Sequence, residues 1–366
     1  MDDKEDISSL VSDLSDLEVA LLLSLAVHEH CLIETTNDCI HDVAKELALI
    51  CSSIFSRTYK ILECSSATSL EDFYSEILVS DVSKASAPYS RPRKGAESLS
   101  IHLNTTEPRD RTRSPGFRNL FGDKKVVDIV IAKNFNYVDE DIQLRALELM
   151  RSKRLNTNHG PIEAPPDFLF VPLVVRSSDQ LHPRMNHHLN DHLILSHFHD
   201  PTDGYVHLEE NTDWLSDGQL STSSVVRKSD AQLKNQSPAV DQNLLDKIQH
   251  LSASVSVGAD IIRYQQDIVV FLRLSRAVAG GITARSNMQF TKLSKLLATL
   301  HGIDYLTPSI VALAARKAFR HRIVLAKPED DRSLQYGSDI QALTKVLAPA
   351  SPDSILDGVL ALEPPL

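Results

Sequence analysis

The chain has 366 residues, of which 42% are hydrophobic and 24% are charged, and its formal net charge is −11. This composition predicts a multi-part protein with packed cores alongside some disordered sequence. The acidic balance argues against general nucleic-acid binding by the whole chain, and no apolar run approaches the roughly 18 uncharged residues of a membrane-spanning helix.

The N-terminal sequence and the cysteines predict an intracellular protein, cytoplasmic or nuclear, with no membrane association. The chain opens Met-Asp-Asp-Lys-Glu-Asp, the reverse of the basic start of a signal peptide. Its four cysteines lie in the first fifth of the chain without CxxC spacing. They therefore indicate a reducing compartment rather than a disulfide framework or a zinc ribbon.

Residues 1–82 predict the first part of an α/β nucleotide-binding core. Apolar residues recur at helical intervals from Leu17 to Leu25 and again from Val43 to Ile50. Between these helices, Cys31-Leu32-Ile33 is a short strand-like run followed by turn-prone residues. A second strand is expected over 59–64, and Ser69 opens a further helix with a capping-box pattern.

Residues 83–125 are rich in Ser, Pro, Arg and Lys, and we expect them to form a disordered basic insert. The second part of the core is expected over 126–210. It contains a β-branched strand at 126–131, a helix at 139–153 and a strand at 168–175. In the last of these, Pro172 indicates a strand end or a sheet edge.

The remaining sequence predicts a linker, a helical domain and a tail. Residues 211–243 are polar and Ser-rich, and residues 329–366 are expected to be a flexible tail with one short helix. The helical domain spans 244–328. Its three expected helices cover 260–279, ended by Gly280-Gly281; 286–300; and 307–319, with Thr307 as N-cap and Pro308 after it.

A specific pattern runs in order through these three helices. It consists of Asp260-Ile261-Ile262-Arg263-Tyr264, Asp267-Ile268-Val269-Val270, Arg276-Ala277-Val278, Gly281-Ile282-Thr283-Ala284-Arg285, His301-Gly302-Ile303-Asp304-Tyr305-Leu306-Thr307-Pro308 and Ala314-Ala315-Arg316-Lys317. This pattern, from about Ser254 to Leu325, resembles the lid of the MoxR and magnesium-chelatase type AAA+ ATPases. The resemblance implies an α/β AAA+-like core, a parallel sheet flanked by helices, joined to an all-α lid.

The resemblance extends more weakly into the core, where the phosphate-binding loop departs from the family. His30 to Glu34 resembles the first strand of that core. The loop after it requires glycines, a lysine and a Ser or Thr to hold phosphates and magnesium. This chain has no glycine in the corresponding residues 35–42. His41 stands where the lysine is expected, and Asp42 adds a charge that repels phosphate.

The other nucleotide-handling positions implied by the resemblance have also changed. Lys133 and Asn134 replace the acidic pair that holds Mg²⁺ and orients water. Val174 or Val175 replaces the polar sensor of the γ-phosphate, and His192 replaces the trans-acting arginine. Arg285 alone remains as a possible lid arginine that contacts a nucleotide, and its alternative is a structural pairing with a carboxylate.

These losses predict an AAA+ pseudo-ATPase that acts as a scaffold or regulatory subunit. It has no catalytic residues and no cofactor, and it assembles with itself or with AAA+ partners. The alternative is an active ATPase component that uses ATP and Mg²⁺ to drive metal insertion or partner remodelling. A third hypothesis is an interaction module controlled through the basic insert. That insert also fits a nuclear-import signal, a phosphorylation-controlled segment or a solvated linker, and without interleaved aromatic residues it predicts no specific nucleic-acid binding.

Histidines and aspartates are concentrated between residues 182 and 207. Such mixtures can bind zinc or similar metals, and the spacing of His188 and His192 would place two imidazoles on one helical face. No motif of known metal geometry is complete, however. We therefore expect a polar surface loop and no metal site.

Overall fold

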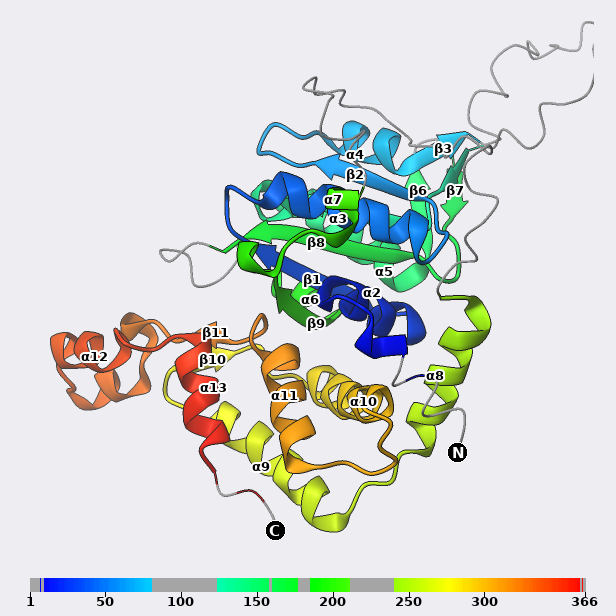
Figure 1. The fold of residues 1–366 in the computed structure, drawn as a ribbon. Helices are drawn as coiled ribbons and strands as arrows, with labels where there is room; N and C mark the ends of the chain where they lie inside the picture. Colours follow the sequence, from blue (N-terminus) through cyan, green and yellow to red (C-terminus); the bar gives the residue numbers. More distant parts are fainter. Residues whose placement is uncertain are drawn as a thin grey trace, which may run out of the picture.

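The structure is a computed structural model that describes residues 7, 10–80, 124–157, 160–176, 185–210, 240–362 and 364. Most of the predicted basic insert, most of the predicted linker and His182 therefore lie outside the described residues. The described part begins with an α/β core and continues into a helical lid below it (Figure 1).

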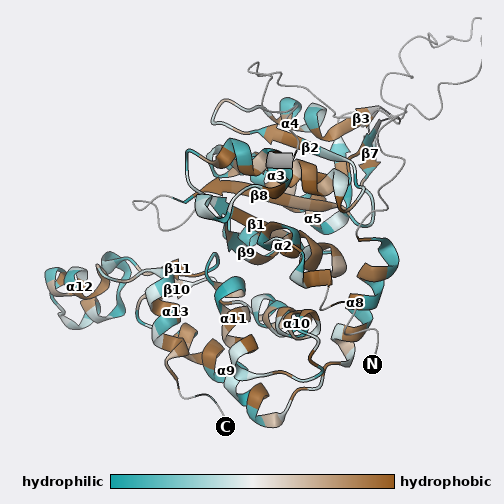
Figure 2. Ribbon diagram, viewed as in Figure 1, coloured by the Kyte–Doolittle hydropathy of each residue, from teal (hydrophilic) through white to brown (hydrophobic). Residues whose placement is uncertain are grey.

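The core is built on a five-stranded sheet whose strand pairings are all parallel, in the order β2-β5-β8-β1-β9. The strands are β1 (His30–Thr35), β2 (Tyr59–Glu63), β5 (Ile129–Lys133), β8 (Leu169–Val175) and β9 (Leu193–Phe198). Every residue of β1 and β5 is buried, as expected for parallel strands covered on both faces. The hydropathy view shows these strands as largely apolar ribbons in the middle of the core (Figure 2).

Helices cover both faces of this sheet. Alternate residues of β1 face opposite sides, so Cys31 and Ile33 belong to one hydrophobic cluster and Leu32 to the other. The first cluster includes α2 (Asp16–Ala26) and α3 (Ile40–Ser53), and the second includes α4 (Leu70–Ile77) and α5 (Glu140–Ser152). The predicted fold class, a parallel sheet flanked by helices with a helical lid, is confirmed.

Two details of the core differ from the sequence predictions. Pro172 does not lie at an edge, because β8 pairs with β5 on one side and with β1 on the other. The strand expected at 126–131 is divided between β4 (Lys124–Val126) and β5. β4 pairs with β3 (Leu78–Ser80) in a separate antiparallel ladder, so the strand begins within the predicted insert.

The remaining core elements are short. β6 (Arg154–Thr157) and β7 (Gly160–Glu163) form a small hairpin-like ladder, and α6 (His187–Asn190) and α7 (Val206–Glu210) flank β9. The capping box predicted for Ser69 is present at the start of α4, where its hydroxyl accepts from the backbone N–H of Asp72 at 3.2 Å.

The lid contains four consecutive helices and a two-stranded ladder. The helices are α8 (Gln242–Ser254), α9 (Ala259–Leu274), α10 (Ala284–Leu300) and α11 (Pro308–Phe319), and the strands are β10 (Val278–Gly280) and β11 (Val324–Leu325). Thr307 caps α11, as predicted. The helix predicted over 260–279 ends earlier, because the chain leaves the helical path after Leu274 and pairs as β10 with β11.

The prediction of a flexible tail over 329–366 is wrong for most of that range. The tail carries α12 (Ile340–Leu347) and α13 (Pro352–Leu360). α13 packs against α9 and α11, and Leu356 on its inner face is fully buried. Apolar residues at 355, 356 and 359 therefore form the helix face that packs into the hydrophobic cluster of the lid.

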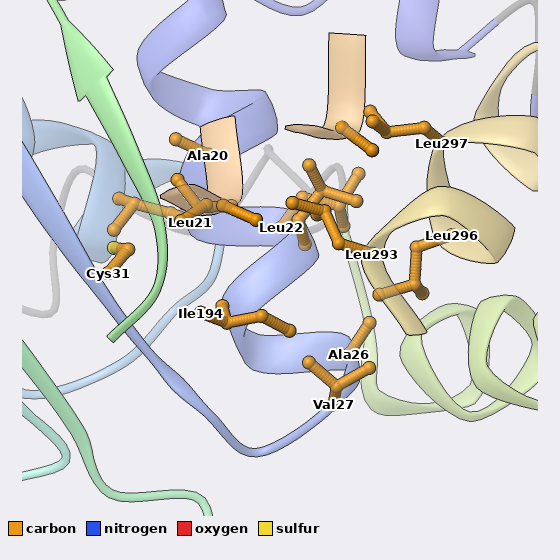
Figure 3. Close-up of a cluster of buried hydrophobic side chains, with 14 of the residues drawn as sticks. Ala20, Leu21, Leu22, Ala26, Val27, Cys31, Ile194, Leu293, Leu296 and Leu297 are labelled. Atoms are coloured by element: carbon orange, nitrogen blue, oxygen red, sulfur yellow. The ribbon is translucent and has the colours of Figure 1, made fainter. Parts of the chain in front are cut away.

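Core and lid share one hydrophobic cluster. Figure 3 shows Leu21 and Leu22 of α2 beside Leu293 of α10, with Ile194 of β9 in the same cluster. All four side chains are fully buried. The lid is therefore packed against the β9 edge of the sheet through side chains of both parts of the chain.

Candidate functional site

The candidate site lies at the carboxyl edge of the sheet, where β1 ends and the chain turns into α3. Ligands of open α/β sheets bind at this edge. Cys39 is the N-cap residue of α3 and its side chain makes no capping hydrogen bond. Asp42, in the first turn, places a carboxylate at the positive end of the helix dipole. The chain itself thus supplies the negative charge that a bound phosphate would bring.

Lys133 dominates the electrostatics of this edge. It is the last residue of β5, and its side chain is only 3% exposed. Its ammonium pairs with the carboxylate of Glu63, at the end of β2, and lies 2.7 Å from Nδ1 of His41 in α3. Burial, together with Lys45, lowers the pKa of Lys133 to about 8. Burial and the Lys133 charge likewise lower the pKa of His41.

The cluster of Lys133, His41 and Glu63 brings together two of the positions singled out in the sequence. A magnesium site needs converging oxygen ligands. This edge instead holds an ammonium whose pairing occupies the carboxylate of Glu63. The sequence indicated the loss of the acidic pair, but it did not indicate that Lys133 would reach the first turn of α3.

Asn134 and Val175 are also placed at the carboxyl edge. Asn134 adopts a left-handed conformation with φ of 58°, and its backbone N–H donates to the carbonyl of Leu173 at 2.7 Å. Val175 is the last residue of β8 and pairs with Thr35 of β1. Its side chain offers no hydrogen-bonding group to a phosphate.

A second cluster of charged residues joins the carboxyl edge of the sheet to the lid and to the C-terminal helix α13. Arg320, which follows α11, pairs with the carboxylate of Glu34 in β1 and donates from Nε to Asp353 of α13 at 2.9 Å. Asp353 also pairs with Arg176 at 2.7 Å, and that guanidinium lies 4.9 Å from the ring centroid of Phe198. We call Glu34, Arg320, Asp353 and Arg176 the latch. Sequence reasoning missed it, because its members lie in four distant segments.

The latch predicts a clear effect of one substitution. Arg320→Ala should lower the free energy of unfolding by about 3 kcal/mol, because it leaves the buried Glu34 carboxylate without its cation. Burial already raises the pKa of Glu34, and Arg320 opposes that shift. Chemical denaturation followed by circular dichroism measures the change.

Arg316→Ala is the matched control for this prediction. Arg316 lies one turn earlier on α11 and also pairs with an α13 carboxylate, that of Asp357, but both side chains are about half exposed. Exposed pairs contribute about 0–1 kcal/mol. Equal losses for Arg316→Ala and Arg320→Ala would contradict the assigned role of the latch.

Arg285 and His192 do not lie at the carboxyl edge. The charge of Arg285 acts on His192, which precedes β9, and on His30, which begins β1. Both histidines mark the amino ends of their strands. Arg285 thus lies near the amino ends of β1 and β9, between core and lid and away from the β1–α3 loop. This position favours the structural alternative, and a contact of Arg285 with nucleotide stays a prediction. Burial, with Arg285 adding to it, lowers the pKa of His192 to about 4.

The histidine-rich segment is not a polar surface loop throughout. His197 lies in β9 and His199 directly follows it, and both are buried. α6 ends at Asn190, so His188 and His192 do not share a helical face. Within the described ranges, no group of three or more His, Cys, Asp or Glu side chains is arranged to hold a metal ion. The short apolar run Leu193-Ile194-Leu195 was the missed signal for this buried strand.

Buried histidines predict that the protein loses stability in acid. Burial, with Lys317 2.9 Å away and His199 nearby, lowers the pKa of His197 to about 3, although Asp203 opposes the shift. An unfolded histidine titrates near 6.5. Below that pH the unfolded chain binds a proton that the folded chain does not. The free energy of unfolding therefore falls, by up to about 1.4 kcal/mol per pH unit for each such histidine.

Urea denaturation at a series of pH values from 7.5 down to 5 tests this expectation. His197→Gln should reduce the slope of stability against pH, whereas His301→Gln, at an exposed lid position, should leave it unchanged. An identical slope in wild type and His197→Gln would show that His197 is not a source of the acid sensitivity.

Comparison with known proteins supports the fold that the geometry shows. Residues 271–343 match the family description "AAA lid domain". The fold is similar to that of a proposed ATPase from Cytophaga hutchinsonii, with a TM-score of 0.55 and 12% sequence identity over 96% of this chain and 97% of the other. At that identity the likeness concerns the fold alone. That match runs from the end of α9 through β10, α10, α11 and β11 to the first half of α12.

Two curated relatives are similar over shorter stretches. Both are called Maintenance of telomere capping protein 2. The Kluyveromyces lactis protein is 30% identical over 99 residues, and the Saccharomyces cerevisiae protein is 36% identical over 98 residues. These stretches are 26% and 25% of this chain and span only 36% and 28% of the relatives.

Among the described helices, none is long and apolar enough to cross a membrane.

Proposed function

We propose that this protein is a non-catalytic member of the MoxR and magnesium-chelatase type of AAA+ proteins, acting as a scaffold or regulatory subunit. The observation that carries the proposal is the cluster of Lys133, His41 and Glu63 at the carboxyl edge. The buried ammonium of Lys133 is paired there with the half-exposed carboxylate of Glu63 from the same chain. These two charged side chains at the carboxyl edge are therefore paired with one another without nucleotide or Mg²⁺.

The physical case against nucleotide chemistry rests on several missing contacts. A charge-assisted hydrogen bond contributes about 1.5–3 kcal/mol. The β1–α3 loop has no glycine, and His41 replaces a fixed cation by a side chain whose pKa is lowered. Lys133 repels Mg²⁺, and Asp42 repels phosphate. Together these changes remove the affinity on which an ATPase depends.

The joint between core and lid supports the same function. ATPase cycles of this architecture use closure and opening of mobile parts. Here the lid is joined to the core by a shared hydrophobic cluster and by the latch. These contacts favour a single arrangement of core and lid. A fixed arrangement of this kind is suited to presenting one constant surface to other copies of the chain or to AAA+ partners.

The similarity to proteins named for maintenance of telomere capping suggests a setting. We place the protein in the nucleus or cytoplasm, as a component of an assembly that maintains chromosome ends. This role is independent of ATP hydrolysis, because the proposed contribution is a binding surface rather than a chemical step.

Calorimetry with ATP and Mg²⁺, combined with mass determination in solution, tests the proposal. We expect no Mg²⁺-dependent nucleotide binding, no ATP hydrolysis above a mock preparation, and the same mass with and without nucleotide. An active AAA+ ATPase measured in parallel is the positive control. Tight Mg²⁺-dependent binding would overturn the proposal and favour an ATPase component that drives metal insertion or partner remodelling.

A further inference from the structure

A pocket of about 710 Å³ lies apart from the residues of the carboxyl-edge cluster. Three segments enclose it: residues 10–15 with the first turn of α2, the flank and end of α3, and the chain from the end of β9 into the first turn of α7. Its lining includes neither His41, Asp42 nor Lys133. The pocket is thus a separate feature that the proposed function leaves unused.

The Asp, Glu, Lys and Arg residues that line this pocket are all acidic. Five carboxylates line it and no lysine or arginine does; the five are Asp13, Asp16, Glu18, Glu46 and Asp203. The buried pair, Glu18 and Glu46, is structural. Glu18 lies 2.8 Å from Nε2 of His207, and Glu46 accepts from the backbone N–H groups of His207 and Leu208 at 2.9 and 2.8 Å. The other three carboxylates are in exposed residues and carry the charge of the rim.

His199 supplies a second, independent observation. It lines the pocket, yet the residue is only 3% exposed. Neither of its ring nitrogens has a hydrogen-bond partner among the residues that the structure describes. Its backbone is fixed by a hydrogen bond from its N–H to the carbonyl of Glu34, and its ring packs against Tyr205 with centroids 5.3 Å apart. Buried imidazoles ordinarily have partners. Since His199 borders the pocket, a group that enters the pocket can supply the missing one.

We propose that this pocket binds an organic cation, an ammonium or guanidinium group carried on a short apolar stem. Leu14, Leu17 and Ile54 are among the apolar residues that would cover the stem. The rim carboxylates would hold the cation, and the unprotonated ring nitrogen of His199 would accept one of its N–H groups. Such a group comes either from a free amine or from a lysine or arginine side chain of another protein.

Calorimetry on the full chain tests the proposal with two probes. Agmatine represents a free amine, and an Nα-acetyl-arginine methylamide represents a side chain within a polypeptide. Adenosine is the uncharged comparison ligand. Binding of agmatine alone assigns the pocket to free amines, and binding of the methylamide assigns it to protein side chains as well. Both results support a cation site, whereas binding of neither cation, or equal binding of adenosine, overturns it.

Rim variants locate the binding. The double variant Asp13→Asn and Asp16→Asn should raise Kd about tenfold or more, because it removes two of the charges that hold the cation. Asp260→Asn is the matched control, since it removes an exposed carboxylate from the first turn of α9, outside the pocket. Equal Kd values for the wild type and the rim variant would overturn the proposal.

The imidazole gives a readout that does not depend on folding stability. The ring resonances of His199 should shift on addition of a cation probe, and His199→Phe should abolish binding while retaining the wild-type circular dichroism spectrum. If His199→Phe fails to fold, the resonance shift in the wild-type protein still decides the matter. Unshifted His199 resonances during saturating binding would place the ligand elsewhere and overturn the assignment.

Discussion

Gly281→Ala should prevent the lid from adopting its folded arrangement. Gly281 has φ of +95°, a region that residues with a side chain rarely adopt. A Cβ built there would overlap the carbonyl oxygen of Arg322 and lie 2.7 Å from its carbonyl carbon. Both atoms belong to the backbone and cannot move aside as a side chain would. We expect a loss of about 4 kcal/mol or more, from strain and overpacking together.

The neighbouring glycine provides a stringent control. Gly280 lies in β10, has no positive φ, and a Cβ added to it would meet no atom within 4 Å. Gly280→Ala should therefore change the free energy of unfolding by less than about 1 kcal/mol. Thermal unfolding of both variants, followed by circular dichroism, gives the comparison. Similar behaviour of the two would refute the close approach of Gly281 to the Arg322 backbone.

Leu293→Ala should weaken core and lid together. Leu293 is fully buried in the cluster that α10 shares with α2 and β9. Removing its side chain leaves a cavity and should cost about 2–5 kcal/mol. Since both parts of the chain line that cavity, we expect hydrogen exchange to show reduced protection in β1 and β9 as well as in α10 and α11.

The control for this prediction is Leu313→Ala. Leu313 lies in α11 and is 39% exposed, so it loses less apolar contact and should cost below about 1 kcal/mol. A reduction of protection confined to α10 and α11 in Leu293→Ala would show that the lid unfolds by itself. That result would also remove one of the two supports for a fixed lid.

The sequence predicted the elements whose signals are local. The capping box at Ser69 and the N-cap at Thr307 are each set by side chains within three residues of the backbone they bind. The resemblance in α9 to α11 was also carried by contiguous residues. Periodicity placed α2, α3 and α5 within a few residues of their ends.

What the sequence did not predict depends on distant partners. Pro172 suggested an edge because it lacks a backbone donor, yet it pairs with Ala132 inside the sheet. The end of α9 at Leu274 is set by pairing of β10 with β11, about fifty residues further on. The sequence predicts a loose tail where the structure has α13, because the contacts that stabilise this helix are to α9, α11 and Arg320, all outside it.

The candidate site likewise combines features that the local sequence shows with features that depend on distant partners. The absence of glycine and lysine from the β1–α3 loop is visible in the sequence. The pairing of Lys133 with Glu63 is not, because it joins residues separated by seventy positions. The position of Arg285 at the amino edge required the packing of α10 against β9, which no local pattern encodes.

The cluster shared by α2, β9 and α10 also governs how the chain can be divided. A fragment that ended before α8 would expose the leucines of α2 to water, and a fragment that began at α8 would expose those of α10. Exposed apolar surfaces of this kind promote aggregation. Dividing this chain into a core fragment and a lid fragment would therefore produce two fragments that each expose apolar surface and aggregate. The two parts should be expressed as one chain.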